Sequence, residues 1–168
     1  MLLVVAAVAA AIVLLLGGGD GDSTVAPAAG EFTLTYPENW NALTDAQLKA
    51  LQNPPLVLIR REDGKAVIVV RRDKPGIPDA AQLARDLEKE FKQRLPDYKR
   101  VSASIITLPA GRAFFYSYVR EKKGTLHTVV IVPSGDRSYV FNTVSVPGDE
   151  QVADEVGAII KSLKVNAS

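Results

Sequence analysis

Alternation of hydrophobic and polar residues predicts strands along much of the chain. In segment 31–36 every second residue is apolar or aromatic, the period-two pattern of a half-buried strand. Two β-branched runs, 56–61 and 65–72, are joined by an Asp-Gly pair, which is typical of a hairpin turn. Turn-forming residues separate four further apolar runs. We expect strands in these runs, over about 98–108, 111–121, 125–132 and 138–146.

Apolar residues at helical spacing predict three helices. Thr44 and Gln47 have the spacing of a capping box, which indicates the start of a short helix. Asp79 is placed to cap a helix of about sixteen residues, because apolar residues then recur at every fourth position. Pro96 ends that helix, and a last amphipathic helix is expected over 149–163.

The connections and the strand interiors indicate how these elements pack. The connectors between successive strands are short, so consecutive strands should pair antiparallel. Segment 114–119 has apolar or aromatic residues at both parities, and 129–132 is continuously apolar, so both faces of the sheet should be covered. We therefore predict an α+β fold: an α/β/α sandwich around a central antiparallel sheet of about six to seven strands, preceded by an N-terminal apolar helix.

The N-terminal segment differs from the rest of the chain. Residues 1–16 are all apolar and would span about 24 Å as a helix, so 1–19 is interpreted as a membrane anchor or signal segment. A flexible linker is predicted over 20–30 and a globular domain over 31–168. We expect a cell-membrane location, with a single-pass anchor and an extracytoplasmic domain. The alternatives are secretion after cleavage near Ala28, or packing of the leader into the fold.

Composition and charge exclude several classes of function. With 47% hydrophobic and 23% charged residues, a chain of 168 residues fits one globular domain. A net charge of +1 argues against nucleic acid as a partner of the whole chain. The chain has no Cys and one His, which argues against disulfides and His-based or thiolate metal sites. No metal and no cofactor are predicted.

One motif resembles a known family. The sequence Phe32-x-Leu34-x-Tyr36-Pro37-x-x-Trp40, followed by two strands, a helix, an antiparallel meander and a C-terminal helix, is similar to the PsbP-like family. That family is named for an extrinsic protein of photosystem II and shares its fold with a Ran-binding factor. The resemblance implies an exported, non-catalytic α/β/α domain that binds other proteins. The metal role of the photosynthetic branch is not implied, because His127 stands alone.

No catalytic set can be assembled from the sequence. His127 lies in mid-strand and is interpreted as a structural residue, although an uncatalogued hydrolase using it is an alternative. The chain has no G-x-S-x-G elbow, phosphate-binding loop, calcium loop or H-E-x-x-H motif. We predict no catalytic residues and no enzymatic activity.

A cluster of basic residues is the most uneven charge feature. These residues are interpreted either as solvated edge charges or as a docking patch for an acidic partner or anionic lipid headgroups. Two aromatic residues of the family-like motif could line an adjoining groove. The candidate binding residues are Arg60, Arg61, Lys65, Arg71, Arg72, Lys74, Tyr36 and Trp40.

These observations lead to a functional hypothesis. We expect a membrane-tethered or exported accessory domain that binds an envelope protein or an anionic membrane surface. The alternatives are a carrier of a lipid or another small apolar molecule, and the hydrolase.

Overall fold

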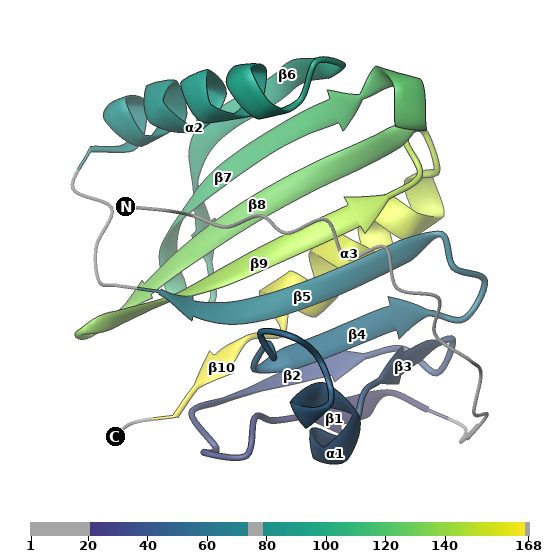
Figure 1. Cartoon of the computed structure of the whole chain (residues 1–168). Helices are drawn as coiled ribbons and strands as arrows, with labels where there is room; N and C mark the ends of the chain where they lie inside the picture. Colours follow the sequence, from purple (N-terminus) through teal and green to yellow (C-terminus); the bar gives the residue numbers. More distant parts are fainter. Residues whose placement is uncertain (1–20, 74–78, 167–168) are drawn as a thin grey trace.

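The computed structural model describes residues 21–73 and 79–166, and Figure 1 shows a twisted sheet between helices. The main sheet has seven strands, and every neighbouring pair is antiparallel. In spatial order the strands are β3 (Trp40–Ala42), β4 (Val57–Arg61), β5 (Ala66–Asp73), β9 (Arg137–Ser145), β8 (Thr125–Ser134), β7 (Gly111–Arg120) and β6 (Tyr98–Leu108). The edges of this sheet are therefore β3 and β6.

One face of the sheet is covered mainly by α2 (Ala80–Arg94). Asp79 caps this helix by accepting from the backbone N–H groups of the second and third residues after it. Leu87 and Phe91 point from α2 into a cluster with the buried aromatic side chains of β7. The short α1 (Asp45–Lys49) buries Leu48 in a smaller cluster beside β4 and β5.

The opposite face carries the larger core. It is covered by α3 (Glu150–Lys161) and by a three-stranded sheet in the order β1 (Ser23–Val25), β2 (Phe32–Tyr36) and β10 (Lys164–Val165). Phe32 and Leu34 are fully buried there, and Phe32 meets Tyr139 edge to face with ring centroids 4.9 Å apart. A single 3-10 turn, η1 (Glu121–Lys123), joins β7 to β8.

This architecture confirms the predicted fold class. The covered faces explain why apolar residues occupy both parities of the central strands. One assignment differs: the strand predicted at 31–36 joins the small sheet as β2, and β3 is the seventh strand of the main one. The backbone turns sharply between them, where the Trp40 N–H donates to the carbonyl of Pro37. This turn separates two adjacent strands into different layers.

The N-terminal predictions require correction. The segment interpreted as an anchor lies outside the described residues, and no helix within 21–73 and 79–166 is long and apolar enough to span a membrane. The longest described helix, α2, has 15 residues and is amphipathic, whereas a span needs about 20 mainly apolar residues. The predicted cell-membrane location with a single-pass anchor is corrected accordingly, because no described helix supplies such an anchor.

The segment predicted as a flexible linker contains an ordered strand. Residues Ser23–Val25 pair with β2 as β1, and Pro27 beyond them is buried. Backbone hydrogen bonds to β2 order this segment, although its few apolar residues suggested a flexible linker. The alternative cleavage site near Ala28 falls between β1 and β2, so cutting there would remove β1 from the fold.

Candidate functional site

The predicted basic patch does not form one surface. Adjacent residues of a strand point to opposite faces, so Arg61 is buried at 8% exposure beneath α3, whereas Arg60 lies half-buried on the other face. The same alternation separates Arg71 from Arg72 on β5. Lys74 lies outside the described residues.

Several of these basic side chains are also engaged within the fold. Lys65 Nζ lies 2.9 Å from a carboxylate oxygen of Asp149, and Arg72 forms an ion pair with Glu31. The Arg71 guanidinium donates to the backbone carbonyl of Asn53 at 2.9 Å. Such contacts hold loops and helix ends to the sheet, so these cations are less available to a partner than the sequence suggested.

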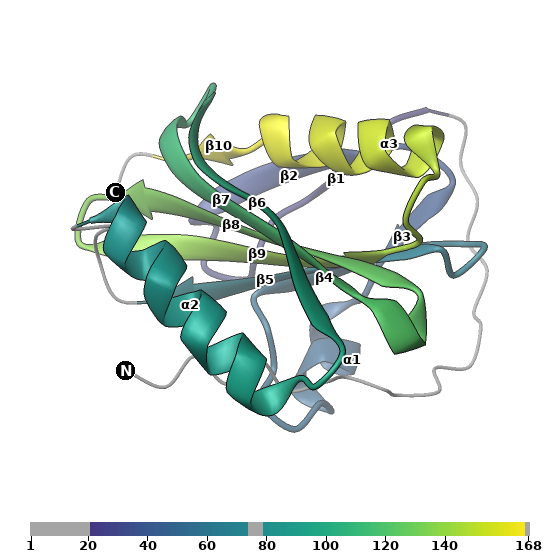
Figure 2. The same ribbon diagram turned by 90° about the horizontal axis from the view of Figure 1, so that it is seen from above.

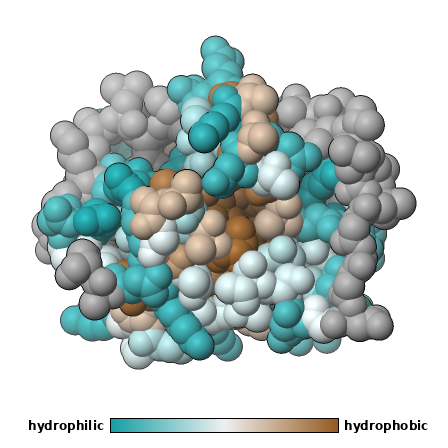
Figure 3. All heavy atoms as spheres, turned by 90° about the horizontal axis from the view of Figure 1, so that it is seen from below, coloured by the Kyte–Doolittle hydropathy of each residue, from teal (hydrophilic) through white to brown (hydrophobic). Residues whose placement is uncertain are grey.

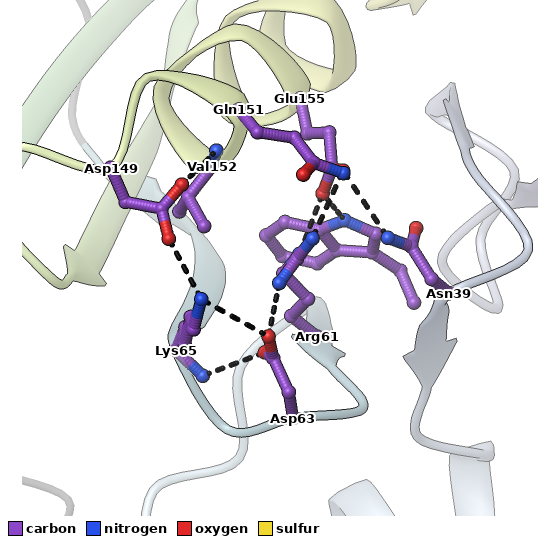
Figure 4. Close-up of polar contacts among 9 residues, drawn as sticks. Asn39, Arg61, Asp63, Lys65, Asp149, Gln151, Val152 and Glu155 are labelled. Atoms are coloured by element: carbon purple, nitrogen blue, oxygen red, sulfur yellow. Dashed lines mark hydrogen bonds and ion pairs between the residues drawn. The ribbon is translucent and has the colours of Figure 1, made fainter.

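The aromatic residues of the motif are mainly core residues. Trp40 is 1% exposed, and its indole Nε1 donates to Glu155 Oε2 at 2.8 Å. Arg61 Nε donates to the same oxygen at 2.7 Å, and the side-chain amides of Asn39 and Gln151 donate to the other oxygen. Figure 4 shows this group converging on α3 from β4 and from the turn before β3. Tyr36 is half-buried against the larger core.

The Glu155 cluster is therefore a structural clasp. Hydrogen bonding to Arg61 lowers the pKa of Glu155 to about 2, although partial burial opposes that shift. Each of its oxygens accepts at least two hydrogen bonds from side chains of the fold, so the carboxylate ties α3 to β3 and β4. Asp63 and Asp149 extend the network at its exposed side, through Arg61 and Lys65.

His127 is packed as a structural residue. Its ring stacks on Tyr118 with centroids 4.8 Å apart, and Thr125 Oγ1 lies 3.0 Å from Nε2. Burial is the main reason why the pKa of His127 falls to about 4. A general base should have a pKa near the working pH. The nearby carboxylate of Asp97 is engaged by Arg120, at 2.5 Å, and no carboxylate within residues 79–166 hydrogen-bonds to His127.

A cavity opens near the tip of the β8–β9 hairpin. It has a volume of about 580 Å³ and is bordered by Glu31, Arg137, Tyr139 and Asn166. The carboxylate of Glu31 is already held by Arg72 and Arg137 and accepts from the Tyr139 hydroxyl at 3.3 Å. This charged rim suits a polar ligand better than the apolar molecule of the carrier hypothesis.

The most open backbone of the sheet is the outer side of β6. This strand has 11 residues, pairs with β7 alone among the strands of 21–73 and 79–166, and is largely exposed from residue 99 to residue 107. Figure 2 shows it running along the top of the sheet between α2 and α3, with neither helix crossing it. Val101 is 59% exposed and Ile105 is 38% exposed. Unpaired N–H and C=O groups on such an edge can accept a further strand.

The two halves of β6 are protected differently. The first half carries the charges of Lys99 and Arg100 and a β-bulge between Arg100 and Ser102. Charges and bulges usually prevent another strand from pairing with an exposed edge. From Ser102 to Thr107 the strand has no charge, proline, glycine or bulge. Another strand can therefore pair with this second half, which we call the unguarded half of β6.

The other edge of the sheet is far less open. β3 has three residues, and α1 follows two residues after it. Figure 3 shows apolar side chains gathered at the centre of this side, framed by hydrophilic ones. Val25 of β1, Ala42 of β3 and Leu56, the residue before β4, are half-buried and pack against the larger core. We interpret this patch as the rim of that core.

Comparison with known proteins identifies the fold. No family model and no curated protein sequence matches the chain. Among solved structures, PsbP of the cyanobacterium Synechocystis matches with a TM-score of 0.64 at 11% identity, over 89% of this chain and 95% of that one. The chain has the PsbP fold. The predicted resemblance is thus confirmed at the level of the fold.

Other proteins share this PsbP fold. The Ran-binding protein Mog1p of Saccharomyces cerevisiae matches with a TM-score of 0.54 at 10% identity, over 88% of this chain and 96% of that chain. A protein of unknown function from Pseudomonas aeruginosa matches with a TM-score of 0.53 at 13% identity, over 88% and 99% of the two chains. At these identities the likeness concerns the fold and not the activity.

Two features of this structure were missed by sequence reasoning. Glu155 gives no signal, because a single acidic residue on an amphipathic helix usually faces solvent. β6 was predicted as a strand, but its position at the sheet edge depends on the order of the strands. The signal that could have identified it is the uncharged run from Ser102 to Thr107, which lacks the alternation of a half-buried strand.

Proposed function

We propose that the protein is a non-catalytic binding module, which accepts an extended strand of another polypeptide at the unguarded half of β6. The observation that carries this proposal is the exposed, uncharged edge from Ser102 to Thr107. Backbone hydrogen bonds to an added strand would supply affinity, and side-chain contacts along it would supply specificity.

The contacts of the ionisable groups support a role without turnover. Glu155 and Asp97 are held by arginines inside the fold, and the low pKa of His127 makes it a weak base at neutral pH. The fold is compatible with this role, since Mog1p is described as a Ran-binding protein. An envelope protein or an anionic membrane surface as the specific partner stays a prediction, as does a small apolar ligand.

A matched pair of substitutions tests the edge. Ile105→Lys places a cation in the unguarded half of β6, whereas Val146→Lys places the same cation on another exposed apolar residue, just after the central strand β9. Both proteins would be immobilised and used to capture proteins from an extract of the native cells, with quantitative mass spectrometry of what binds.

The expected result is at least a tenfold loss of specific partners for Ile105→Lys and an unchanged set for Val146→Lys. Circular dichroism and thermal unfolding would confirm that both variants fold. Equal capture by the two variants would place the binding surface elsewhere and refute the proposal.

A further inference from the structure

Charge is distributed unevenly between the β6 edge and the rest of the chain. Segment 94–123, which contains β6, β7 and η1, has seven basic and two acidic residues, a net charge of +5, whereas the whole chain has +1. The remaining residues are therefore acidic on balance. Because β6 and β7 are the last two strands on this side of the sheet, the excess positive charge follows the edge that we propose for strand binding.

The basic residues of this segment differ in whether the fold neutralises them. Three arginines form ion pairs with carboxylates of the fold at 2.5–2.7 Å, namely Arg94, Arg100 and Arg120. Three other basic residues are exposed and form no ion pair with any residue of 21–73 and 79–166. We call these residues the free cations of the edge; they are Arg112, Lys122 and Lys123.

Arg112 lies beside one end of the unguarded half of β6. It is directly opposite Thr107 in the β6–β7 ladder, and Phe114 is directly opposite Ile105. Residues opposite each other point to the same side of the sheet, here the side covered by α2, where Phe114 is buried. A strand added outside β6 would lie two strand spacings, about 10 Å, from Arg112. The long Arg112 side chain and a carboxylate of that strand can meet over the small Thr107.

Lys122 and Lys123 lie near the other end of β6. They belong to η1, whose first residue, Glu121, donates its backbone N–H to the carbonyl of Asp97 at 3.0 Å. Asp97 immediately precedes β6. Lys99 adds to the charge at this end, because it is 69% exposed and its contact with Glu121, at 3.5 Å, is a weak one between solvated groups. A strand paired with the unguarded half would therefore have cations near both of its ends.

We propose that the segment accepted at β6 belongs to an acidic partner and consists of a short β-branched core with Asp or Glu residues on both sides. This inference rests on the proposed strand acceptance and names the chemistry of the partner. The core would pair with Ser102 to Thr107, and the flanking carboxylates would lie near the free cations.

Charge complementarity favours this partner over other occupants of the edge. A second copy of the chain would bring its own basic residues against those of the first. An anionic membrane could neutralise the free cations, but lipid headgroups offer no peptide backbone to the unpaired N–H and C=O groups of β6.

Fluorescence anisotropy of the full chain with labelled synthetic peptides tests the inference. The probe has a Val-Thr-Val-Thr-Val core with two glutamates at each end. One control peptide has glutamines in place of the glutamates. A second control keeps the glutamates and has prolines at two successive core positions, so that one of the missing N–H groups must face β6.

We expect the acidic probe to bind about tenfold more tightly than either control peptide. Its binding should weaken about fivefold between about 0.1 and 1 M salt, because the Debye length falls from about 10 to about 3 Å. Phosphatidylglycerol vesicles, tested by co-sedimentation, should not bind.

Reversal of the free cations locates the binding. Arg112→Glu and the double variant Lys122→Glu/Lys123→Glu should each weaken binding of the acidic probe about fivefold or more. The matched controls are Lys161→Glu on α3 and the double variant Lys49→Glu/Lys161→Glu, which reverse exposed lysines on other elements and should bind as the unmodified chain. Circular dichroism and thermal unfolding would establish that each variant is folded.

The outcomes separate this inference from the proposed function. Equal affinity for the acidic and glutamine peptides would overturn the inference and leave strand acceptance intact. Equal affinity for the acidic peptide and its proline control would refute strand acceptance itself, because charge alone would then explain the binding.

Other results would give the edge to a different occupant and also overturn the inference. These are binding of the vesicles without binding of the acidic probe, and a dimer of the chain that is lost with Ile105→Lys. Unchanged affinity of both free-cation variants would place the acidic ligand elsewhere on the molecule, with the same consequence. So would the absence of probe binding up to about 1 mM, the weak end of measurable association.

Discussion

Replacing Glu155 by Gln should strongly destabilise the protein. The substitution keeps the size of the side chain but removes the charge that pairs with Arg61, whose side chain is 9% exposed. Trp40 and Asn39 donate to different oxygens of Glu155, and Gln has a single acceptor oxygen, so the variant also loses one of these two hydrogen bonds. Asp63 remains as a second partner of Arg61 at the solvent side.

The magnitude follows from the pKa of the carboxylate. A drop of the Glu155 pKa from 4.5 to about 2 corresponds to roughly 3 kcal/mol of differential stabilisation of the charged form. The Glu155 side chain is 15% exposed, so solvent screening reduces this only modestly. We therefore expect Glu155→Gln to lower the free energy of unfolding by about 2–3 kcal/mol, which is roughly 5–10 °C in Tm for a domain of this size.

The same shift predicts an acid dependence of stability. Because the folded-state pKa of Glu155 is depressed, its contribution is complete above about pH 4.5 and is lost as pH falls toward 2. The unmodified chain should therefore lose roughly 3 kcal/mol more than the Gln variant over that interval.

Urea unfolding followed by circular dichroism at several pH values between 2 and 7 measures both effects. The matched control is Asp154→Asn, which removes the same charge from an exposed neighbouring position of α3. The two variants should differ by about 2 kcal/mol at pH 7. Equal stabilities and equal pH profiles of the two variants would show that the clasp contributes nothing and that our reasoning is wrong.

Three further measurements test other parts of the structure. The His127 ring should titrate by NMR with a midpoint near pH 4, and a midpoint at its ordinary value of 6.5 would contradict the buried stack on Tyr118. Phe91→Ala removes a fully packed ring 4.6 Å from that of Tyr118, so urea unfolding should show a loss of about 3–5 kcal/mol. Arg120→Met leaves the carboxylate of Asp97, 3% exposed, without its cation and should cost about 3 kcal/mol in the same assay. Adding Asp97→Asn should restore part of that loss, and a double-mutant cycle without coupling would contradict the pairing.

Local patterns in the sequence determined the elements of this fold. The cap of α2 by Asp79 and the hairpin turn at Gly64, with its φ of +74°, act over a few residues. Such signals depend on backbone sterics and nearby hydrogen bonds, so they can be recognised without knowing the rest of the chain. Residues 114–119 likewise showed that both faces of the sheet are covered, because burial on either face requires apolar side chains.

The tertiary structure alone decided which residues meet. Arg61 and Glu155 are 94 positions apart, and their contact exists because α3 packs on the face of the sheet to which Arg61 points. Strand order likewise left β6 at the edge, although neighbouring strands have similar composition. A local pattern determines whether a segment forms a helix or a strand and which of its sides is apolar. It does not determine which other segment packs beside it. That choice depends on the free energy of the whole packed chain, in which distant side chains compete for the same core.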